Sequence, residues 1–229
     1  MRPIVVLWAL LVLTGCVTGT RSLTLPVAHL ADRSDAAPTA ASSSRAPSTS
    51  PSALAGPVRI RSIRDARVFE EKPRDPSTPS VRGRLEDVGP EARARLIGRQ
   101  RDSFGKAMGD LALAGDRTVE DEVRTLLVQG LEARGIRVAD DDPTATPIDV
   151  TIDEFWAWFS PGMWAIGFDA RLRTQIELAA ASGTRRVEVL GRGGNRGQIE
   201  SDANWLLAYQ RAFDDYAARL SEVIDEWTR

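Results

Sequence analysis

A long alternation of apolar and polar residues between positions 164 and 178 constrains the fold of this chain more than any other feature. Successive side chains of a β-strand point to opposite faces, so a period of two indicates a strand with one face on a core and the other in water. That division is typical of an antiparallel sheet. The apolar-face positions are Trp164, Ile166, Phe168, Ala170, Leu172, Thr174, Ile176 and Leu178, and the polar-face positions include Asp169, Arg171, Arg173, Gln175 and Glu177.

Strand-forming segments and turns flank this run on both sides. Ser160-Pro161-Gly162 precedes it and Ser182-Gly183-Thr184 follows it, and both are turn sequences that would make hairpins. The remaining predicted strands are residues 58–65, a segment that begins at residues 136–138, residues 148–159 and residues 185–190. A long surface loop is expected at residues 69–95, which carry four prolines, with a helical turn at residues 91–96.

Two amphipathic helices complete the pattern. Thr118 and Asp121 resemble a capping box, Gly135 supplies the stop, and apolar residues recur at helical spacing between them, which predicts a helix over residues 119–134. A second helix follows Ser201 or Asp202, and its apolar stripe is Trp205, Tyr209, Ala212, Phe213, Tyr216, Leu220, Ile224 and Trp227. The order strand, helix, four strands, helix predicts an α+β fold of two layers, with a mainly antiparallel sheet and the helices on one face.

The N-terminal residues predict a secreted and lipidated protein. Arg2 precedes an apolar core at residues 4–13, which is too short to span a bilayer because a spanning helix needs about 20 apolar residues. Cys16 is the only cysteine, and Leu13-Thr14-Gly15-Cys16 resembles the bacterial lipobox, in which the thiol receives diacylglycerol and the new amino terminus an acyl chain such as palmitate. Residues 1–15 are therefore expected to be a signal peptide and Cys16 the lipidation site. The alternative is a plain secretory signal with Cys16 as an incidental thiol.

Residues 16–56 are expected to be the lipidated Cys16 and a disordered linker. From residue 36 to residue 55 every residue except Arg45 and Leu54 is Ala, Ser, Pro or Thr, a composition that buries too little apolar surface to fold. As a flexible coil, this segment would give the domain a reach of about 35 Å from the lipid surface. Residues 23–27 could add an edge strand, and residues 57–229 are expected to be a single periplasmic α+β domain.

Few residues that could support catalysis or bind a metal are present. The chain carries a net charge of -2 and one histidine, His29, which lies beside the linker. A nucleic-acid interface needs a basic face, and a Ser-His-Asp triad or a zinc site needs histidine or cysteine inside the domain.

Individual motifs also lack the pattern of a functional site. Asp140–Asp142 lack the spacing of a calcium loop, so we interpret them as a solvated turn. Residues 191–197 lack the pattern of a nucleotide loop, so we interpret them as a flexible strand-to-helix connection. Asp153 and Glu154 are neighbours in a strand and point to opposite faces, not across a cleft. We expect no catalytic residue, no metal, no cofactor and no nucleic-acid partner.

Aromatic residues gather around the predicted turn at residues 160–162. Consecutive bulky residues there supply both faces of the sheet. One interpretation is that one face packs under the helices and the other is covered by the linker or the Pro-rich loop. The other is an exposed aromatic tip that contacts a partner protein or lipid, because Trp and Tyr dominate binding hot spots. The candidate contact residues are Phe155, Trp156, Trp158, Phe159, Met163 and Trp164.

Several segments, taken in order, resemble one family. They are Asp65-Ala66-Arg67 after a strand, Ile97-Gly98-Arg99-Gln100-Arg101-Asp102, Gly105, the helix that begins at Val119, and Leu131-Glu132-Ala133-Arg134-Gly135-Ile136-Arg137-Val138. With the meander and the aromatic final helix, they resemble the YajG-type bacterial envelope lipoproteins over residues 58–229. The long Ala/Ser/Pro/Thr segment and the Pro-rich loop at residues 69–90 depart from the family. The resemblance implies a lipid-anchored periplasmic protein, supplies no catalytic residue, and extends in architecture to auxiliary lipoproteins of lipid-transport ABC systems.

These inferences predict a non-enzymatic lipoprotein that its acyl chains hold in the outer membrane of a Gram-negative bacterium, with its domain in the periplasm. Val17 in place of Asp after the lipidated cysteine favours the outer membrane. The leading hypothesis is a binding or assembly module with another envelope protein as partner. The alternative is an accessory lipoprotein of a lipid-transport system that binds acyl chains, and the third is a hydrolase that acts through carboxylates and arginines.

Overall fold

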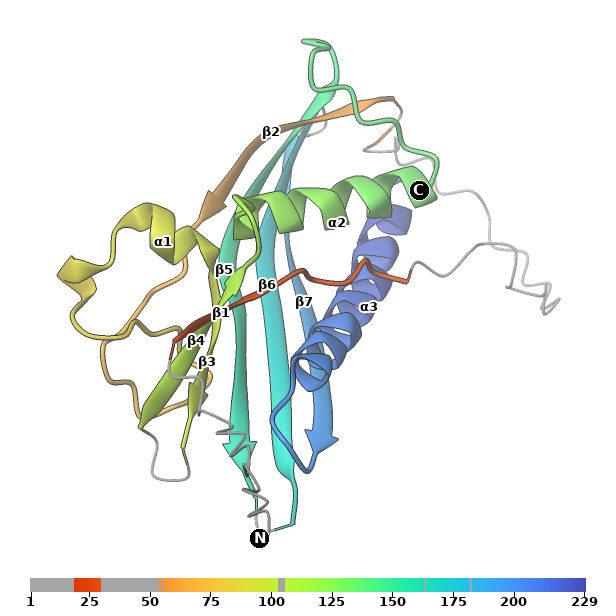
Figure 1. The fold of residues 1–229 in the computed structure, drawn as a ribbon. Helices are drawn as coiled ribbons and strands as arrows, with labels where there is room; N and C mark the ends of the chain where they lie inside the picture. The colour runs from red at the N-terminus through yellow and green to blue at the C-terminus, as the bar shows by residue number, and fades with distance from the viewer. Residues whose placement is uncertain (1–18, 30–53, 55, 103–105, 163, 182) are drawn as a thin grey trace, which may run out of the picture.

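The computed structural model describes residues 19–29, 54, 56–102, 106–162, 164–181 and 183–229. These residues form one mixed, largely antiparallel sheet with helices packed against it (Figure 1), so the predicted α+β class is confirmed. The seven strands are β1 (Thr20–Leu23), β2 (Val58–Asp65), β3 (Leu96–Arg101), β4 (Ala107–Leu113), β5 (Thr146–Pro161), β6 (Ile166–Ala180) and β7 (Gly183–Gly197). The helices are α1 (Pro90–Arg95), α2 (Val119–Ala133) and α3 (Asp202–Trp227), with a short 3-10 turn, η2 (Leu85–Asp87).

The sheet is built on the two hairpins that join β5, β6 and β7. Their antiparallel registers extend from Ile148 opposite Leu178 to Pro161 opposite Ile166, and from Ile166 opposite Gly197 to Ala180 opposite Gly183. The other edge of β5 pairs in parallel first with β2 and then with β3. Strand β4 lies antiparallel to β3, and β1 adds in parallel to β4 at the edge of the sheet.

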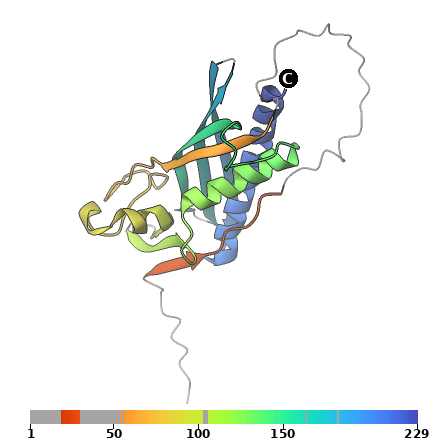
Figure 2. The same cartoon turned by 90° about the horizontal axis from the view of Figure 1, so that it is seen from above.

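Helices α2 and α3 cover one face of this sheet (Figures 1 and 2), as the amphipathic patterns predict. The capping box at the start of α2 is present, with the Thr118 side chain accepting from the Asp121 amide and the Asp121 carboxylate accepting from the Thr118 amide. All eight residues of the predicted α3 stripe are buried. They pack on the apolar face of β6, which explains why two segments of different periodicity share one core.

The glycine-rich residues 191–197 are the second half of β7, so their interpretation as a flexible strand-to-helix connection is wrong. Helix α3 crosses this strand at backbone distance. A Cβ atom on Gly193 would lie 2.0 Å from the Ala208 carbonyl oxygen, and one on Gly191 would lie 2.3 Å from the Ala212 carbonyl oxygen. Glycine is therefore required here because the helix leaves no room for a side chain.

Strands β3 and β4 were not predicted, and the strand expected to begin at residues 136–138 is reduced to an isolated bridge between Val58 and Val138. The β3–β4 pairing contains two register shifts, one between Leu96 and Gly98. Such irregularities break the period of two on which strand prediction depends. The expected helical turn at residues 91–96 corresponds to α1.

Residues 19–29, which the sequence placed in the linker with an optional edge strand at residues 23–27, belong to the folded unit. Leu23 is buried, and Arg21 forms ion pairs of 2.9 Å with Glu200 and 3.0 Å with Asp202 at the start of α3. At the other end of the Ala/Ser/Pro/Thr segment, the Leu54 amide donates to the Trp227 carbonyl oxygen at 3.0 Å. The described part of the fold therefore includes residues on both sides of the Ala/Ser/Pro/Thr segment, and it begins before residue 57, the expected start of the domain.

The predicted signal peptide, Cys16, most of the predicted linker and Met163 lie outside the described residues. Within the part of the chain that the structure describes, no helix is both long enough and apolar enough to cross a membrane.

Candidate functional site

The face of the sheet opposite α2 and α3 is covered near β5 by the segment that connects β2 to η2, here called the Pro-rich cover (residues 69–84). Side chains of β5 alternate between the two faces. Phe155 packs against Tyr209 and Phe213 of α3, with ring centroids 5.6 and 6.0 Å apart. Its neighbour Trp156 meets Phe69 of the cover edge to face, with centroids 5.9 Å apart. The predicted surface loop is thus a packed layer with a small core of its own, formed by Phe69, Val81, Leu96, Ala112 and Trp156.

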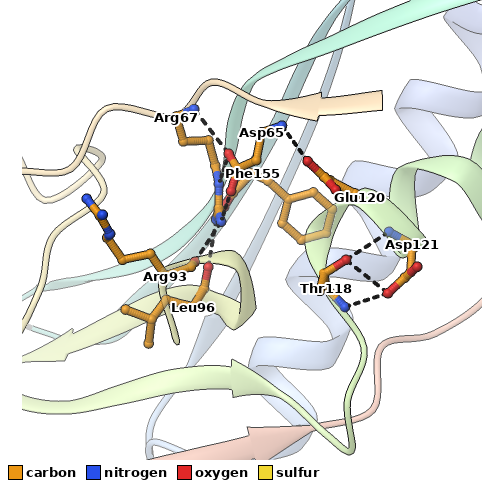
Figure 3. Close-up of polar contacts among 8 residues, drawn as sticks. All are labelled: Asp65, Arg67, Arg93, Leu96, Thr118, Glu120, Asp121 and Phe155. Atoms are coloured by element: carbon orange, nitrogen blue, oxygen red, sulfur yellow. Dashed lines mark hydrogen bonds and ion pairs between the residues drawn. The ribbon is translucent and has the colours of Figure 1, made fainter. Parts of the chain in front are cut away.

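Arg67 fixes the start of this cover (Figure 3). Its guanidinium is fully buried and donates to the carbonyl oxygens of Leu96 at 2.6 Å, Phe155 at 2.9 Å and Arg93 at 2.9 Å. Its charge is balanced by the Asp65 carboxylate, and the Asp65 amide donates to Glu120 of α2 at 2.8 Å. The Asp65-Ala66-Arg67 segment therefore joins β2, β3, β5, α1 and α2 at one point. It holds in place the chain that directly precedes the Pro-rich cover.

A cavity of about 860 Å³ lies between the Pro-rich cover and the ends of β3, β4 and β5. This volume is in the range of small-molecule and cofactor sites. Its lining contains seven basic side chains and only two carboxylates, and we call it the basic pocket. The basic residues are Lys72, Arg74, Arg82, Arg84, Arg99, Arg101 and Lys106, and the acidic residues are Glu71 and Asp102.

The inner wall of the basic pocket consists of two arginines on β3. Arg99 is buried, donates through Nε to Asp110 of β4 at 2.8 Å, and also donates to the Val81 carbonyl oxygen of the cover. Arg101 donates to the Ser80 hydroxyl at 3.1 Å. Burial, and next the nearby charge of Arg99, lower the pKa of Arg101. The charge of Arg99 disfavours a second cation beside it, and an anion bound nearby would offset this repulsion.

A smaller share of the cations at the outer rim of the basic pocket is paired with carboxylates than of the cations in its wall. Arg84 pairs with Asp87 at 2.9 Å and with Glu86 at 2.5 Å, and neither carboxylate lines the pocket. Within the described residues, the exposed side chains of Lys72, Arg74, Arg82 and Lys106 make no ion pair. Both lysines of the chain therefore line this opening, and neither forms an ion pair with another described residue. Four such cations around one opening can bind an anionic group by charge and hydrogen bonding.

The candidate residues of the aromatic hairpin have separate environments. Phe155, Trp156 and Phe159 are buried, and Phe159 also lines the basic pocket. Trp158 is half-buried beneath the Arg171 guanidinium, 5.2 Å from its ring centroid. Trp164 is 88% exposed and lies before the start of β6, so its predicted place on the core face of that strand is wrong. The hairpin is thus packed along its strands, and an exposed aromatic side chain remains at its tip.

The other residues weighed in the sequence have partners of their own. His29 is exposed, 3.3 Å from Asp214, and no group of three His, Cys, Asp or Glu side chains in the described ranges could hold a metal ion. Asp140 accepts from the Ile60 amide at 2.9 Å, as part of the turn that joins α2 to β5. Glu154 accepts from Arg173 at 2.7 Å, and Asp153 accepts from Gln175 at 3.0 Å. Each of these carboxylates has a structural partner.

The basic pocket was missed in the sequence because a net charge of -2 for the whole chain conceals a local excess of cations. Two signals were available. Lys72, Arg74, Arg82 and Arg84 fall in one short segment, and the only two lysines, Lys72 and Lys106, lie on either side of the Arg99 and Arg101 alternation. Neither signal shows that these segments meet in space.

Comparison with known proteins adds likeness of fold without a function. No family model matches the chain, and no curated protein matches it. Among solved structures, a Xanthomonas campestris protein of the DUF330 family superposes with a TM-score of 0.40 and 12% identity, over 76% of this chain and 85% of that one. A candidate lipoprotein from Caulobacter crescentus CB15 gives a TM-score of 0.31 and 17% identity, over 47% of this chain and 81% of that one. A further uncharacterised protein gives a TM-score of 0.38 and 11% identity, over 73% of this chain and 94% of that one. At these scores the likenesses carry no argument about activity or partners.

Proposed function

We propose that this chain is a lipid-anchored envelope lipoprotein that acts by binding and not by catalysis, and that the basic pocket receives an anionic group of another envelope component. The single observation that carries the proposal is the pocket lining of seven basic side chains against two carboxylates. Cys16 supplies the anchor, and the outer membrane with a periplasmic domain is the proposed location. Membership of the YajG-type lipoproteins is part of the same proposal and depends on the sequence motifs.

The arrangement of cations in the pocket favours binding of an anionic group over catalysis of a reaction of that group. Arg99 is already committed to Asp110 and Val81, so it gives the wall a fixed shape and charge. The rim cations Lys72, Arg82 and Lys106 are exposed and able to adapt to a ligand. A general acid or base would need a titratable group near neutral pH facing the substrate, and arginine stays protonated under those conditions.

A second candidate function uses the same pocket. An accessory lipoprotein of a lipid-transport system would bind an amphiphile, with its anionic group at the rim and part of its acyl chain against the apolar wall that Val81, Pro76 and Phe159 contribute. This candidate differs from the first in what enters the pocket. The same experiment can therefore separate the two.

The test is photocrosslinking in native membranes. A photoreactive residue in place of Lys72, at the pocket rim, is expected to give reproducible adducts with an anionic envelope component. The matched control is the same probe at Arg185, an exposed arginine at the far end of β7. A protein adduct that the control lacks supports an assembly module, and a lipid adduct supports lipid handling. Equal adduct patterns at Lys72 and Arg185 would contradict the proposal.

A further inference from the structure

The directions of the strands place several chain segments at one end of the sheet, which we call the anchor end. Strands β3, β5 and β7 finish there, at Arg101, Pro161 and Gly197, while β4 and β6 start there, at Ala107 and Ile166. Because β1 runs parallel to β4, the chain that precedes β1 also comes from this end. Figure 1 shows the tips of β5, β6 and β7 together at the bottom of the view.

The anchor is separated from this end by very little chain. Cys16 and Gly19 are three residues apart, a length that spans at most about 11 Å. Gly19 is held in the fold, since its carbonyl oxygen accepts from the Asp110 amide at 3.2 Å. Leu23 is only 3% exposed, and Arg21 pairs with Glu200, so β1 is tied to the domain on both sides. Acyl chains on Cys16 would therefore bring a membrane surface within about 11 Å of the start of β1.

The basic pocket lies within reach of that surface. Thr20, Asp110 and Arg99 face one another across β1, β4 and β3, a row two strand spacings or about 10 Å wide. Arg82 lines both the basic pocket and the neighbouring hollow that Thr20 and Ser22 line. Lys106, directly before β4, adds another exposed cation at the same end. Lysine and arginine close to an anionic membrane surface each strengthen attachment.

The anchor end also carries the most exposed large apolar side chain among the described residues. Trp164 is 88% exposed, and Ile199, which follows β7 at the same end, is 71% exposed. Tryptophan is enriched at the level of lipid headgroups, where one part of its ring is apolar and the other can donate a hydrogen bond. An exposed tryptophan on a loop that the anchor holds near lipid is suited to this environment.

We propose that the anchor end lies against the membrane that holds Cys16, with the basic pocket bound to the phosphates of anionic phospholipid headgroups and Trp164 at the headgroup level. This inference rests on the proposed function, because it names the occupant of the same pocket. It also fixes the orientation of the domain. The β6–β7 hairpin at Gly183 is then the end that projects into the periplasm, about 50 Å from the membrane along β6.

The test of orientation is quenching of tryptophan fluorescence by brominated lipids. The lipidated protein would be reconstituted into phosphatidylcholine vesicles with and without phosphatidylglycerol. We expect brominated acyl chains to quench part of the fluorescence, and the Trp164→Phe variant to lose most of the quenchable part. The buried tryptophans Trp156, Trp205 and Trp227 stay unquenched in both proteins, because each is less than 5% exposed. Equal quenching of the two proteins would overturn the proposed orientation.

The test of the headgroup uses the same readout and a charge variant. Phosphatidylglycerol is expected to increase quenching in the wild type, and the Lys72→Gln/Lys106→Gln variant is expected to lose that increase. Each lysine removed should lower the equilibrium constant for contact between the domain and the anionic membrane by about five-fold. Arg185→Gln, a charge change at the far end of the sheet, should behave as the wild type. All three side chains are exposed, so folding is not at risk. A response to phosphatidylglycerol that the double variant keeps would overturn the headgroup assignment.

Two further outcomes separate this inference from the proposed function. Soluble glycerol phosphate, added at the same phosphate concentration, should leave the phosphatidylglycerol-dependent quenching in place; if it abolishes that quenching, the pocket binds free phosphate groups and the lipid assignment is wrong. Lys72 photoadducts with a protein alone, together with unquenched Trp164, would overturn the membrane orientation and retain the binding function. Absence of both adducts and quenching would overturn both proposals.

Discussion

Arg67 and Asp65 form a two-bond ion pair across the single residue Ala66, with Nε to Oδ1 at 2.9 Å and one terminal nitrogen to Oδ2 at 2.8 Å. The remaining donors of Arg67 serve carbonyl oxygens from three other parts of the chain. A buried arginine of this kind contributes to stability only when its charge and donors are fully paired. Removing either partner of the ion pair would leave the other charge uncompensated in a medium of low dielectric. The start of the Pro-rich cover therefore depends on a contact whose two residues are almost adjacent in sequence.

Replacement of Arg67 is expected to destabilise the whole domain. Arg67→Met should lower the free energy of unfolding by about 3 to 5 kcal/mol, because it removes the cation that neutralises the Asp65 carboxylate and the side-chain donor to three carbonyl oxygens. Urea denaturation followed by circular dichroism measures this change. Arg185→Gln, at an exposed position, should change stability by less than about 0.5 kcal/mol. A loss of under about 1 kcal/mol for Arg67→Met would show that water replaces these bonds at little cost.

The contact between α3 and β7 predicts that Gly193 cannot carry a side chain. A Cβ atom there would overlap the Ala208 carbonyl oxygen, so Gly193→Ala should cost about 3 kcal/mol or more as the helix is pushed off the strand. Gly167→Ala on β6 is the matched control, because its nearest new contact would be at an ordinary 3.7 Å. Thermal unfolding of the two variants gives the comparison. Equal melting temperatures would mean that α3 can shift outward without loss of packing.

Attachment of β1 predicts a specific pattern of hydrogen exchange. The amides of Asp110 and Ala114 on the β4 side donate to the carbonyl oxygens of Gly19 and Leu23. Leu23→Asp would place a charge in a buried position and should detach β1, so these two amides should lose protection while amides of β6 keep theirs. Hydrogen exchange followed by mass spectrometry measures both regions. Unchanged protection at residues 110–114 would show that β1 is held by pairing alone and not by burial of Leu23.

Glu122 predicts a measurable dependence of stability on pH. Burial raises the pKa of this carboxyl, and the Arg117 guanidinium, 2.7 Å away, offsets part of that rise. Between the unfolded pKa of about 4.3 and the raised folded pKa, the folded protein binds more protons than the unfolded chain, so stability falls as pH rises through this interval. Glu122→Gln should remove that component. The free energy of unfolding should therefore fall less steeply with pH in the variant than in the wild type over this interval, as measured by urea denaturation at a series of pH values. A steeper fall for the variant than for the wild type would contradict the assignment.

Much of the architecture followed from local patterns. The period of two over β6, the capping box at Thr118 and the aromatic stripe of α3 each identified an element correctly, because side-chain direction in a strand or helix is set by the backbone repeat. The lipobox at Cys16 is also a local signal, and it stays a prediction. Local patterns failed at residues 191–197. Glycine is required there because helix α3 packs closely against the strand, and this contact cannot be identified from neighbouring residues.

The sequence by itself determined which segments are amphipathic and therefore which faces of β6, α2 and α3 meet the core. Only the tertiary structure decided how segments distant in the chain come together. Parallel pairing of β1 with β4 turned part of an expected linker into the edge of the sheet and shortened the path from Cys16 to three residues. The basic pocket likewise unites Lys72, Arg99 and Lys106 from three segments. Charge and polarity can be identified from local sequence. The contacts between distant segments depend on chain topology, which local periodicity does not determine.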